Sequence, residues 1–284
     1  MSTSPLARRA LALAAVLIGL WAAAVGCRPR VEFAPADLPQ TLANRNVRFG
    51  LPAEAKHDPA SRDAFLIDRP QYVLSYNDSR KIPNWVCWHL SAADIGKADR
   101  SAFADDPGLP DGFRHVTTGM YTGSGFDRGH MCPSKDRSDS KENNEPLFYM
   151  TNIVPQAPKC NQGAWARFED HCRKLVRDGN ELYIACGPHG AGGTGTEGEK
   201  EAIGRAVKVT VPAAVWKVVL VLPGADAKPT RDSKTLAVWM PNDQTVGKDW
   251  EAYAVTVGEV EKKTGFTFFP LVPADVARAI KEAH

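Results

Sequence analysis

The side chains that could carry out chemistry are concentrated in two neighbouring segments. The first segment, residues 123–133, contains the run Asp127-Arg128-Gly129-His130. Imidazole can act as a base near neutral pH because its ordinary pKa lies close to that pH. A lone histidine on a loop is more often simply solvated, and a neighbouring arginine and glycine favour catalysis only modestly. His130 is therefore a candidate general base that needs partners elsewhere in the chain.

The second segment, residues 151–169, enters a helix that we expect over residues 161–178. Its apolar side chains recur at helical spacing, and Gly179-Asn180 predicts where the helix ends. At about 100° per residue, Asn161 projects close to the middle of the apolar face. An asparagine at a helix start can cap the helix, or its carbonyl oxygen can bind a hard cation such as Mg²⁺. The helix alone favours the cap, and the two roles are compatible.

Charged and amide side chains around these two residues have structural and functional interpretations. Glu169 lies at the border of the apolar face, four residues before Arg173, so the two can form an ion pair on a solvated edge. Alternatively, Glu169 orients waters of the same cation and Arg173 binds phosphate. Asn152 and Gln156 can satisfy backbone groups of a loop. Surface charge is the simplest interpretation of three further residues, Arg100, Arg128 and Arg167.

Predicted strands precede the first segment, and no composition break divides the chain. Residues 71–76 and 85–90 are aromatic and β-branched runs separated by a turn-rich link, so we expect paired antiparallel strands. Residues 96–125, rich in Asp, Gly and Pro, indicate a long loop, and such loops inside compact domains are usually functional. One domain is the simplest interpretation of this pattern.

The C-terminal half contains further strands and two short helices. Apolar runs of strand length occupy residues 182–186, 207–211 and 215–222. The last two runs flank a Pro-Ala-Ala turn and predict a buried hairpin. Short helices are expected over residues 255–264 and 273–282.

The N-terminus is predicted to carry an export signal. Arg8 and Arg9 precede an uncharged apolar run over residues 10–26, a pattern typical of a signal peptide. The run is about 17 residues long, at the lower limit of what spans a bilayer, so export is favoured over a permanent anchor. Residues 24–27 resemble a bacterial lipobox, which makes Cys27 a candidate lipid anchor.

We therefore expect a signal peptide over residues 1–27, a flexible tether over residues 28–64 and a globular domain over residues 65–284. The protein is predicted to be exported, either as a periplasmic protein, as a membrane-anchored lipoprotein or in secreted form. Five cysteines follow Cys27, so at most two disulfides can form within one chain, and no CxxC motif supports a redox or zinc-ribbon interpretation.

Composition narrows the function classes. With 43% hydrophobic and 24% charged residues, the 284-residue chain is neither disordered nor collagen-like. A count of 35 Lys and Arg against 33 Asp and Glu gives a net charge of +2, which excludes a protein that coats nucleic acid by charge alone. Any polyanion must bind at a local concentration of positive charge.

The ordered series of motifs resembles the DNA/RNA non-specific endonuclease family, which includes secreted bacterial sugar-non-specific nucleases and mitochondrial endonuclease G. The resemblance rests on Asp-Arg-Gly-His at 127–130, Thr-Asn-Ile-Val-Pro-Gln at 151–156 and Asn-Gln-Gly-Ala-Trp at 161–165. It extends to flanking motifs at 83–86, 186–188, 211–212, 216–219 (Trp-Lys-Val-Val), 240–242 and 261–270. About residues 65–272 are covered.

The resemblance implies an α+β fold of the ββα-metal (His-Me finger) nuclease type, with a mixed or antiparallel central sheet and flanking helices. It implies an endonuclease that uses Mg²⁺, or Mn²⁺ or another divalent ion, to hydrolyse phosphodiester bonds in DNA and RNA. The expected products carry 5′-phosphate ends. Contacts to phosphate and sugar would leave little sequence selectivity.

The resemblance also implies a role for each matching residue. His130 would be the general base, Asn161 the single direct protein ligand of Mg²⁺, and Glu169 the residue that holds metal-bound waters. Asn152 would position His130 or the substrate. Phosphate oxygens would be bound by Arg128 and Arg173, and Arg100 would match the family's upstream transition-state arginine.

Two other interpretations remain open. The first is a metal-dependent phosphodiesterase acting on a smaller phosphate ester. The second is a non-enzymatic envelope protein with a zinc centre, for which the available ligands are His115, His130, Cys132, Cys160, His171 and Cys172, although their spacing matches no zinc pattern. The sequence also leaves open whether the chain forms a homodimer.

Overall fold

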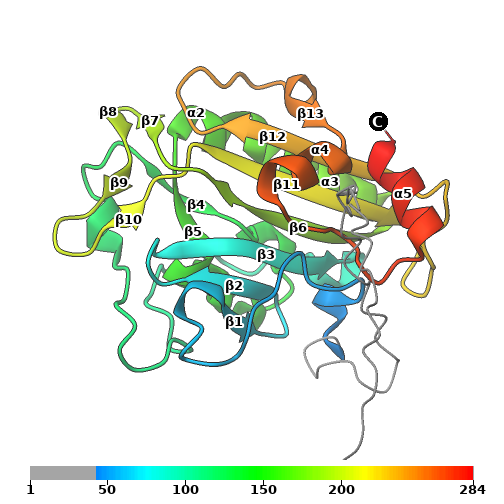
Figure 1. Cartoon of the computed structure of the whole chain (residues 1–284), viewed down its shortest axis with the longest axis horizontal. Coiled ribbons are helices and arrows are strands. Elements are labelled where there is room, and N and C mark those ends of the chain that lie inside the picture. The colour runs from blue at the N-terminus through cyan, green and yellow to red at the C-terminus, as the bar shows by residue number, and fades with distance from the viewer. Residues whose placement is uncertain (1–42, 284) are drawn as a thin grey trace, which may run out of the picture. The chain divides into compact units, whose positions relative to one another are not determined.

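A seven-stranded sheet forms the centre of the computed structural model, which describes residues 43–283 (Figure 1). Every neighbouring pair in this sheet is antiparallel. In spatial order the strands are β1 (Phe65–Asp68), β2 (Val73–Asn77), β3 (Ile82–Leu90), β6 (Glu181–His189), β11 (Ala214–Leu222), β12 (Thr235–Pro241) and β13 (Ala254–Val255). The predicted antiparallel pair over residues 71–76 and 85–90 is confirmed as β2 and β3.

A second, smaller unit is inserted between β3 and β6. Its elements are β4 (Asp127–His130), α1 (Lys141–Asn144), β5 (Ile153–Gln156), α2 (Pro158–Cys160) and α3 (Ala166–Arg177). Within the described residues, β4 and β5 pair only with each other, as an antiparallel two-stranded sheet. This strand–strand–helix order is the ββα arrangement that the family resemblance implies, and the α+β fold class is confirmed.

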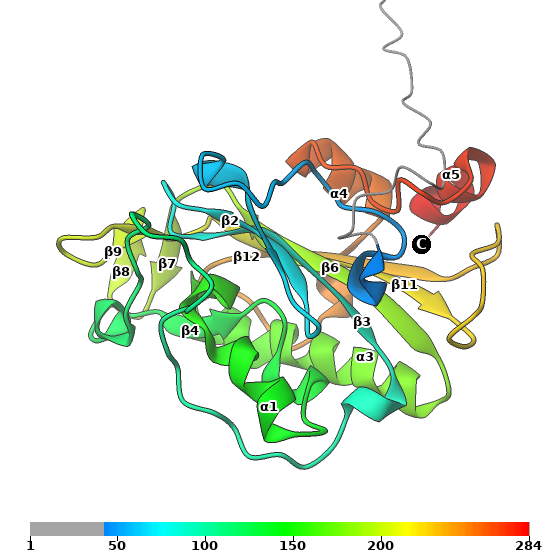
Figure 2. The same ribbon diagram turned by 90° about the horizontal axis from the view of Figure 1, so that it is seen from below.

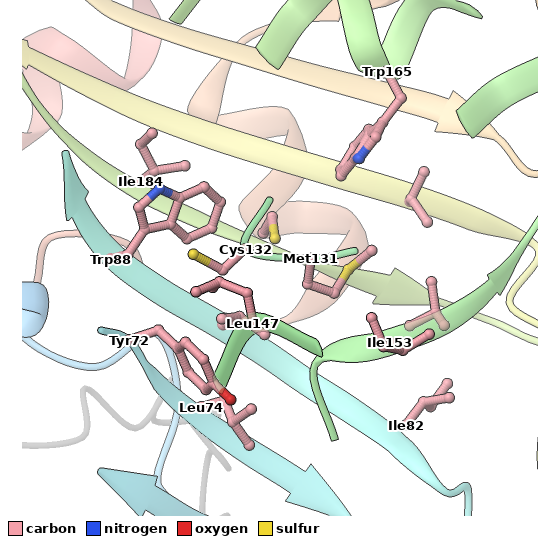
Figure 3. Packing of buried hydrophobic residues seen from close by; sticks show 14 of the residues in the cluster. Tyr72, Leu74, Ile82, Trp88, Met131, Cys132, Leu147, Ile153, Trp165 and Ile184 are labelled. Atoms are coloured by element: carbon pink, nitrogen blue, oxygen red, sulfur yellow. The ribbon is translucent and has the colours of Figure 1, made fainter. Parts of the chain in front are cut away.

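The central sheet is covered on both faces, and this explains why β11 is buried along its whole length. Figure 2 shows α3 on one face and the helices α4 (Val257–Thr264) and α5 (Ala274–Glu282) on the other. Side chains of β11 alternate between two cores, with Val215 and Val219 on the α3 side and Trp216 and Val218 on the α4 side. Figure 3 shows part of the core on the α3 side, where Trp88 and Ile184 of the sheet lie near Met131, Cys132, Ile153 and Trp165 of the smaller unit.

The predicted hairpin over residues 207–222 is wrong. β10 (Val209–Thr210) pairs with β9 (Ala202–Ile203), whereas β11 pairs with β6 and β12. A nine-residue apolar strand buries more surface in the centre of the large sheet than it would beside a two-residue strand. The segment that follows β6 contains another short pair, β7 (Gly193–Gly195) with β8 (Gly198–Lys200).

The two C-terminal helices are confirmed. Thr256 caps the start of α4 by accepting a hydrogen bond from the backbone N–H of Glu259. α4 ends at Gly265, whose φ of 74° is left-handed, a conformation that glycine adopts readily.

The packed chain begins earlier than residue 65, so the expected tether is wrong for residues 43–64. Asn46 and Val47 are buried, and the backbone N–H of Leu271 donates to the carbonyl of Phe49. These contacts hold the segment against the sheet and the C-terminal region. The predicted signal peptide, the lipobox cysteine Cys27 and residues 28–42 of the tether lie outside the described residues.

No helix within residues 43–283 is long and apolar enough to cross a membrane. The cysteines of this part of the chain are all buried free thiols, so it contains none of the disulfides that the sequence allowed; they are Cys87, Cys132, Cys160, Cys172 and Cys186.

Candidate active site

The pair of strands β4 and β5 forms the floor of the candidate site. Asp127 lies opposite Gln156, and His130 lies opposite Ile153. Gly129 is required between them because a Cβ atom there would lie 2.2 Å from Oε1 of the buried Gln156. The Asp-Arg-Gly-His motif therefore encodes a close strand pairing as well as reactive side chains.

His130 ends β4 and packs against two aromatic rings. The ring centroids of Phe103 and Phe148 lie 5.3 Å and 4.9 Å from that of His130. Nε2 of His130 is buried and has no hydrogen-bond partner among the described residues. Burial, together with the positive charge of Arg100, lowers the pKa of His130 to about 3. The imidazole is therefore neutral at neutral pH and retains a free nitrogen.

Asn152 fixes the chain immediately after His130. Its Oδ1 accepts from the N–H of Cys132 at 2.9 Å, and its Nδ2 donates to the carbonyls of Cys132 and Leu147 at 2.9 Å and 2.8 Å. The side chain is fully buried, and these bonds use its hydrogens and its oxygen. Asn152 therefore satisfies loop backbone groups and positions the end of β4, and this geometry does not support contact with substrate.

Asn161 is not a helix cap. Its Nδ2 donates to Oδ2 of Asp127 at 2.8 Å, and Gln162 donates to the same oxygen at 2.8 Å. Because the amide nitrogen is occupied by Asp127, Oδ1 is the atom that remains for a cation. The bond also ties the start of the helical segment to β4, the strand that carries His130.

The expected continuous helix over residues 161–178 is interrupted. Residues Asn161–Trp165 form one wide π-helical turn, and Gly163 has non-helical angles of φ −96° and ψ −117°. Gly163 lies against the backbone of Gly247, whose carbonyl accepts from the N–H of Ala164 at 3.2 Å. The regular helix α3 starts only at Ala166 and ends as predicted near Gly179. The break at Gly163 therefore separates Asn161 from the regular helix α3.

Glu169 and Arg173 do not form the expected ion pair with each other. Oε1 of Glu169 lies 3.3 Å from Nζ of Lys217 on β11. Arg173 is buried and donates to Asp136 and Asp170, at 2.7 Å in each case. With both terminal nitrogens bound to carboxylates, Arg173 is suited to an internal ion pair rather than to phosphate binding. Asp136 and Lys217 are distant in sequence and buried, and a buried ion pair is less screened than one on a solvated edge.

Arg100 and Arg128 gather around the same aromatic rings as His130. The Arg100 guanidinium lies 5.1 Å from the Phe148 ring centroid and donates to Oγ of Ser134 at 3.1 Å. The Arg128 guanidinium lies 4.7 Å from the Phe103 ring centroid. Two arginines from distant parts of the chain therefore flank His130. Arg167, by contrast, is an exposed residue on α3.

The long loop that carries Arg100 and Phe103 is anchored by contacts that the sequence did not predict. Asp106 is buried, and it accepts hydrogen bonds from Arg69 and Thr151. Backbone bonds join Ala104 to the segment that contains Phe148. The signal available in the sequence was an acidic residue three positions after an aromatic one in a loop already expected to be functional.

Asp127, the partner of Asn161, and Lys217, the partner of Glu169, were not predicted as site residues either. Asp127 was visible only as part of a motif, and Lys217 as the one charged residue in an apolar strand. Within residues 43–283, no group of three or more His, Cys, Asp or Glu residues is placed to hold a metal ion. This part of the chain therefore offers no support for the zinc centre that the sequence left open.

Comparisons with known proteins agree with this arrangement. A model of the DNA/RNA non-specific endonuclease family matches residues 50–275. A nuclease from Nostoc sp. is 39% identical over 262 residues, which are 90% of this chain and 92% of that protein. The mitochondrial nuclease EXOG of Xenopus laevis is 33% identical over 238 residues, and the chain spans 65% of its length.

A solved structure gives the same result at the level of the fold. One chain of a crystal structure of the EndoG/EndoGI complex matches with a TM-score of 0.68 and 28% sequence identity, over 83% of this chain and 94% of that chain. Since the family match covers most of the sequence and the strand–strand–helix unit carries its motifs, the chain belongs to the DNA/RNA non-specific endonuclease family and is a hydrolytic endonuclease.

Proposed function

We propose that the protein hydrolyses phosphodiester bonds in both DNA and RNA with the help of one divalent cation, Mg²⁺ in the first place, and leaves 5′-phosphate ends. The observation that carries this proposal is the bond between Asn161 and Asp127. Asp127 and His130 are the two ends of one four-residue strand, whose terminal Cα atoms are at most about 10 Å apart. The bond ties the Asn161 amide to the strand that carries His130, and this supports the proposal that the two side chains serve one site.

His130 is suited to be the general base. Its neutral ring, with Nε2 unpartnered, can accept a proton from an attacking water. A base whose pKa is about 3 would be weak, but the negative charge of a bound phosphodiester raises the pKa of a nearby imidazole. Asn152 holds the backbone that follows the ring, so the direction of attack is set before the substrate binds.

The residues present fit a hard cation with oxygen ligands. Asn161 would hold it through Oδ1, and Glu169, whose side chain is 13% exposed, would hold waters of its hydration shell. When bound, such an ion stabilises the negative charge that develops on the phosphate and on the leaving oxygen. A single amide ligand suits Mg²⁺, which retains most of its waters in proteins.

Arg100 and Arg128 would supply the local positive charge that the nearly neutral chain needs for a polyanion. Their guanidinium groups stack on Phe148 and Phe103, beside His130. Arginine binds phosphate oxygens in a planar, bidentate geometry. Because such contacts ignore the bases, we expect DNA and RNA to be cleaved with little sequence selectivity.

Cleavage of supercoiled plasmid and of total RNA in Mg²⁺, with EDTA as the metal-free control, tests this function. We expect His130→Ala to lose at least about 10²-fold in rate, whereas His115→Ala, an exposed loop histidine, keeps the wild-type rate. Labelling the products with polynucleotide kinase only after phosphatase treatment would identify 5′-phosphate ends. Hydrolysis of bis(p-nitrophenyl) phosphate without any cleavage of nucleic acid would favour the smaller-ester interpretation instead.

We also propose that the protein is exported by the signal over residues 1–27 and anchored by a lipid at Cys27. The supporting observation is the apolar run followed by a lipobox-like sequence. Labelling of the wild type with radioactive palmitate, and loss of the label in Cys27→Ser, would be expected. An unlabelled wild-type protein found entirely in the medium would favour full secretion.

A further inference from the structure

Lys217 is a buried charge in the middle of an apolar strand. β11 reads Ala-Val-Trp-Lys-Val-Val-Leu-Val-Leu, and all nine residues are buried. The Lys217 side chain is 1% exposed. An ammonium group in such a place is costly unless it is paired. The Trp-Lys-Val-Val motif that contains it is not explained by the catalytic roles assigned above.

The side chain of Lys217 extends from the sheet toward α3. Its Nζ lies 3.3 Å from Oε1 of Glu169, 4.2 Å from the Trp165 ring centroid and 5.4 Å from the Trp88 ring centroid. Figure 3 shows these two indoles in the core between the sheet and the smaller unit. Aromatic faces stabilise a cation when water is excluded, so Lys217 is held in place from two sides.

Glu169 is the carboxylate that Lys217 holds. The other charges nearby satisfy one another, since Arg173 donates to Asp136 and Asp170. Oε2 of Glu169 has no hydrogen-bond partner in the part of the chain that the structure describes. One oxygen is therefore fixed from inside the protein, and the other is available to a water molecule.

We infer that Lys217 is a positioning residue for Glu169, fixing one carboxylate oxygen from beneath α3 so that the other faces the hydration shell of the catalytic cation. This inference rests on the role proposed above for Glu169. It assigns the lysine of the Trp-Lys-Val-Val motif to the metal site, although it lies on the central sheet and outside the strand–strand–helix unit.

The charge states are consistent with this arrangement. Burial raises the pKa of Glu169, and the positive charges of Lys217 and Arg173 act in the opposite direction. Burial by itself would lower the pKa of Lys217, but Glu169 and neighbouring groups raise it above its ordinary value. Lys217 therefore remains an ammonium ion and favours the ionised form of Glu169.

The test compares Lys217→Met with Glu169→Gln and with the double variant. Methionine has nearly the length of lysine without its charge, and thermal unfolding checks that each variant folds. Mn²⁺ binding is measured by electron paramagnetic resonance of the free ion, in the absence of nucleic acid, and plasmid cleavage is measured in parallel. Val219→Ala, two residues along the same buried face of β11, is the control for a disturbed core.

We expect Lys217→Met to weaken Mn²⁺ binding by about 10- to 100-fold and to slow cleavage by a similar factor. In the Glu169→Gln background, Lys217→Met should cause no further loss, because its effect passes through Glu169. Val219→Ala should bind Mn²⁺ as the wild type does. If Lys217→Met alone does not fold, the double variant, which removes both charges, still allows the comparison with Glu169→Gln.

Two results would overturn the inference alone: unchanged Mn²⁺ binding in Lys217→Met while Glu169→Gln is impaired, or losses that multiply in the double variant. Normal Mn²⁺ binding and cleavage by Glu169→Gln would instead reject the proposed role of Glu169, and the inference with it.

Discussion

Replacing Asp127 by alanine should release the amide of Asn161 without touching either proposed catalytic group. In the wild type, Oδ2 of Asp127 accepts one bond from Asn161 and one from Gln162, both at 2.8 Å. The first bond fixes the rotation of the Asn161 amide, and with it the direction of Oδ1. Asp127→Ala removes this constraint, while His130, at the other end of β4, stays paired with Ile153.

The size of the effect follows from the bond that is lost. A hydrogen bond to a charged acceptor contributes about 1.5–3 kcal/mol. Since 1.4 kcal/mol corresponds to a factor of ten in an equilibrium constant, the loss predicts a cation affinity about 10- to 100-fold weaker. Half-exposure of Asp127 places the expected value toward the lower end of this range.

Plasmid cleavage measured as a function of Mg²⁺ concentration gives the result directly. We expect the half-saturating concentration for Asp127→Ala to rise about tenfold or more, with much of the maximal rate recovered at high Mg²⁺. Gln162→Ala is the matched control, because it removes the other donor to the same oxygen and leaves the Asn161 bond in place. A wild-type Mg²⁺ curve for Asp127→Ala would refute the argument that this bond aims the metal ligand.

Two further predictions concern stability. Gly129→Ala brings a Cβ atom to 2.2 Å from Oε1 and 2.6 Å from Cβ of Gln156, so β4 and β5 must separate. The free energy of unfolding, measured in urea, should fall by about 1–3 kcal/mol. An unchanged unfolding midpoint would mean that the two strands adjust freely. Because burial lowers the pKa of His130 to about 3, its contribution to stability is fully present above about pH 6.5 and is lost as the pH falls toward 3. The unfolding free energy of His130→Gln should therefore fall less steeply over this interval than that of the wild type, and parallel curves would contradict the low pKa.

Local patterns were predicted well because they depend on neighbours along the chain. The antiparallel pair β2–β3, the helices α4 and α5 and the end of α3 near Gly179 all follow from periodicity, turn residues and capping. The break at Gly163 did not follow, because it depends on contact with the backbone of Gly247, which is far away in sequence. The hairpin expected over residues 207–222 is wrong for a similar reason, since β11 lies inside the central sheet and pairs with β6 on one side and β12 on the other.

The interpretation of single side chains shows the same division. Asn161 has the residue type of a helix cap, and Glu169 and Arg173 have the spacing of an ion pair. In the folded chain, Asn161 donates a hydrogen bond to Asp127. Glu169 forms its ion pair with Lys217, and Arg173 donates to Asp136. Each of these partners comes from a separate element that the sheet and the smaller unit bring together.

Sequence by itself determined the membership of the family and the types of residue at the site, because an ordered series of motifs is a property of the chain. Tertiary structure alone decided which nitrogen or oxygen of each residue is already occupied and which is free to act. Nε2 of His130 is unpartnered among the described residues because Phe103 and Phe148 pack around the ring, and Oδ1 of Asn161 is available because Asp127 holds the nitrogen. Hydrogen bonds and burial form between groups that are close in space, and spacing along the chain does not specify that proximity.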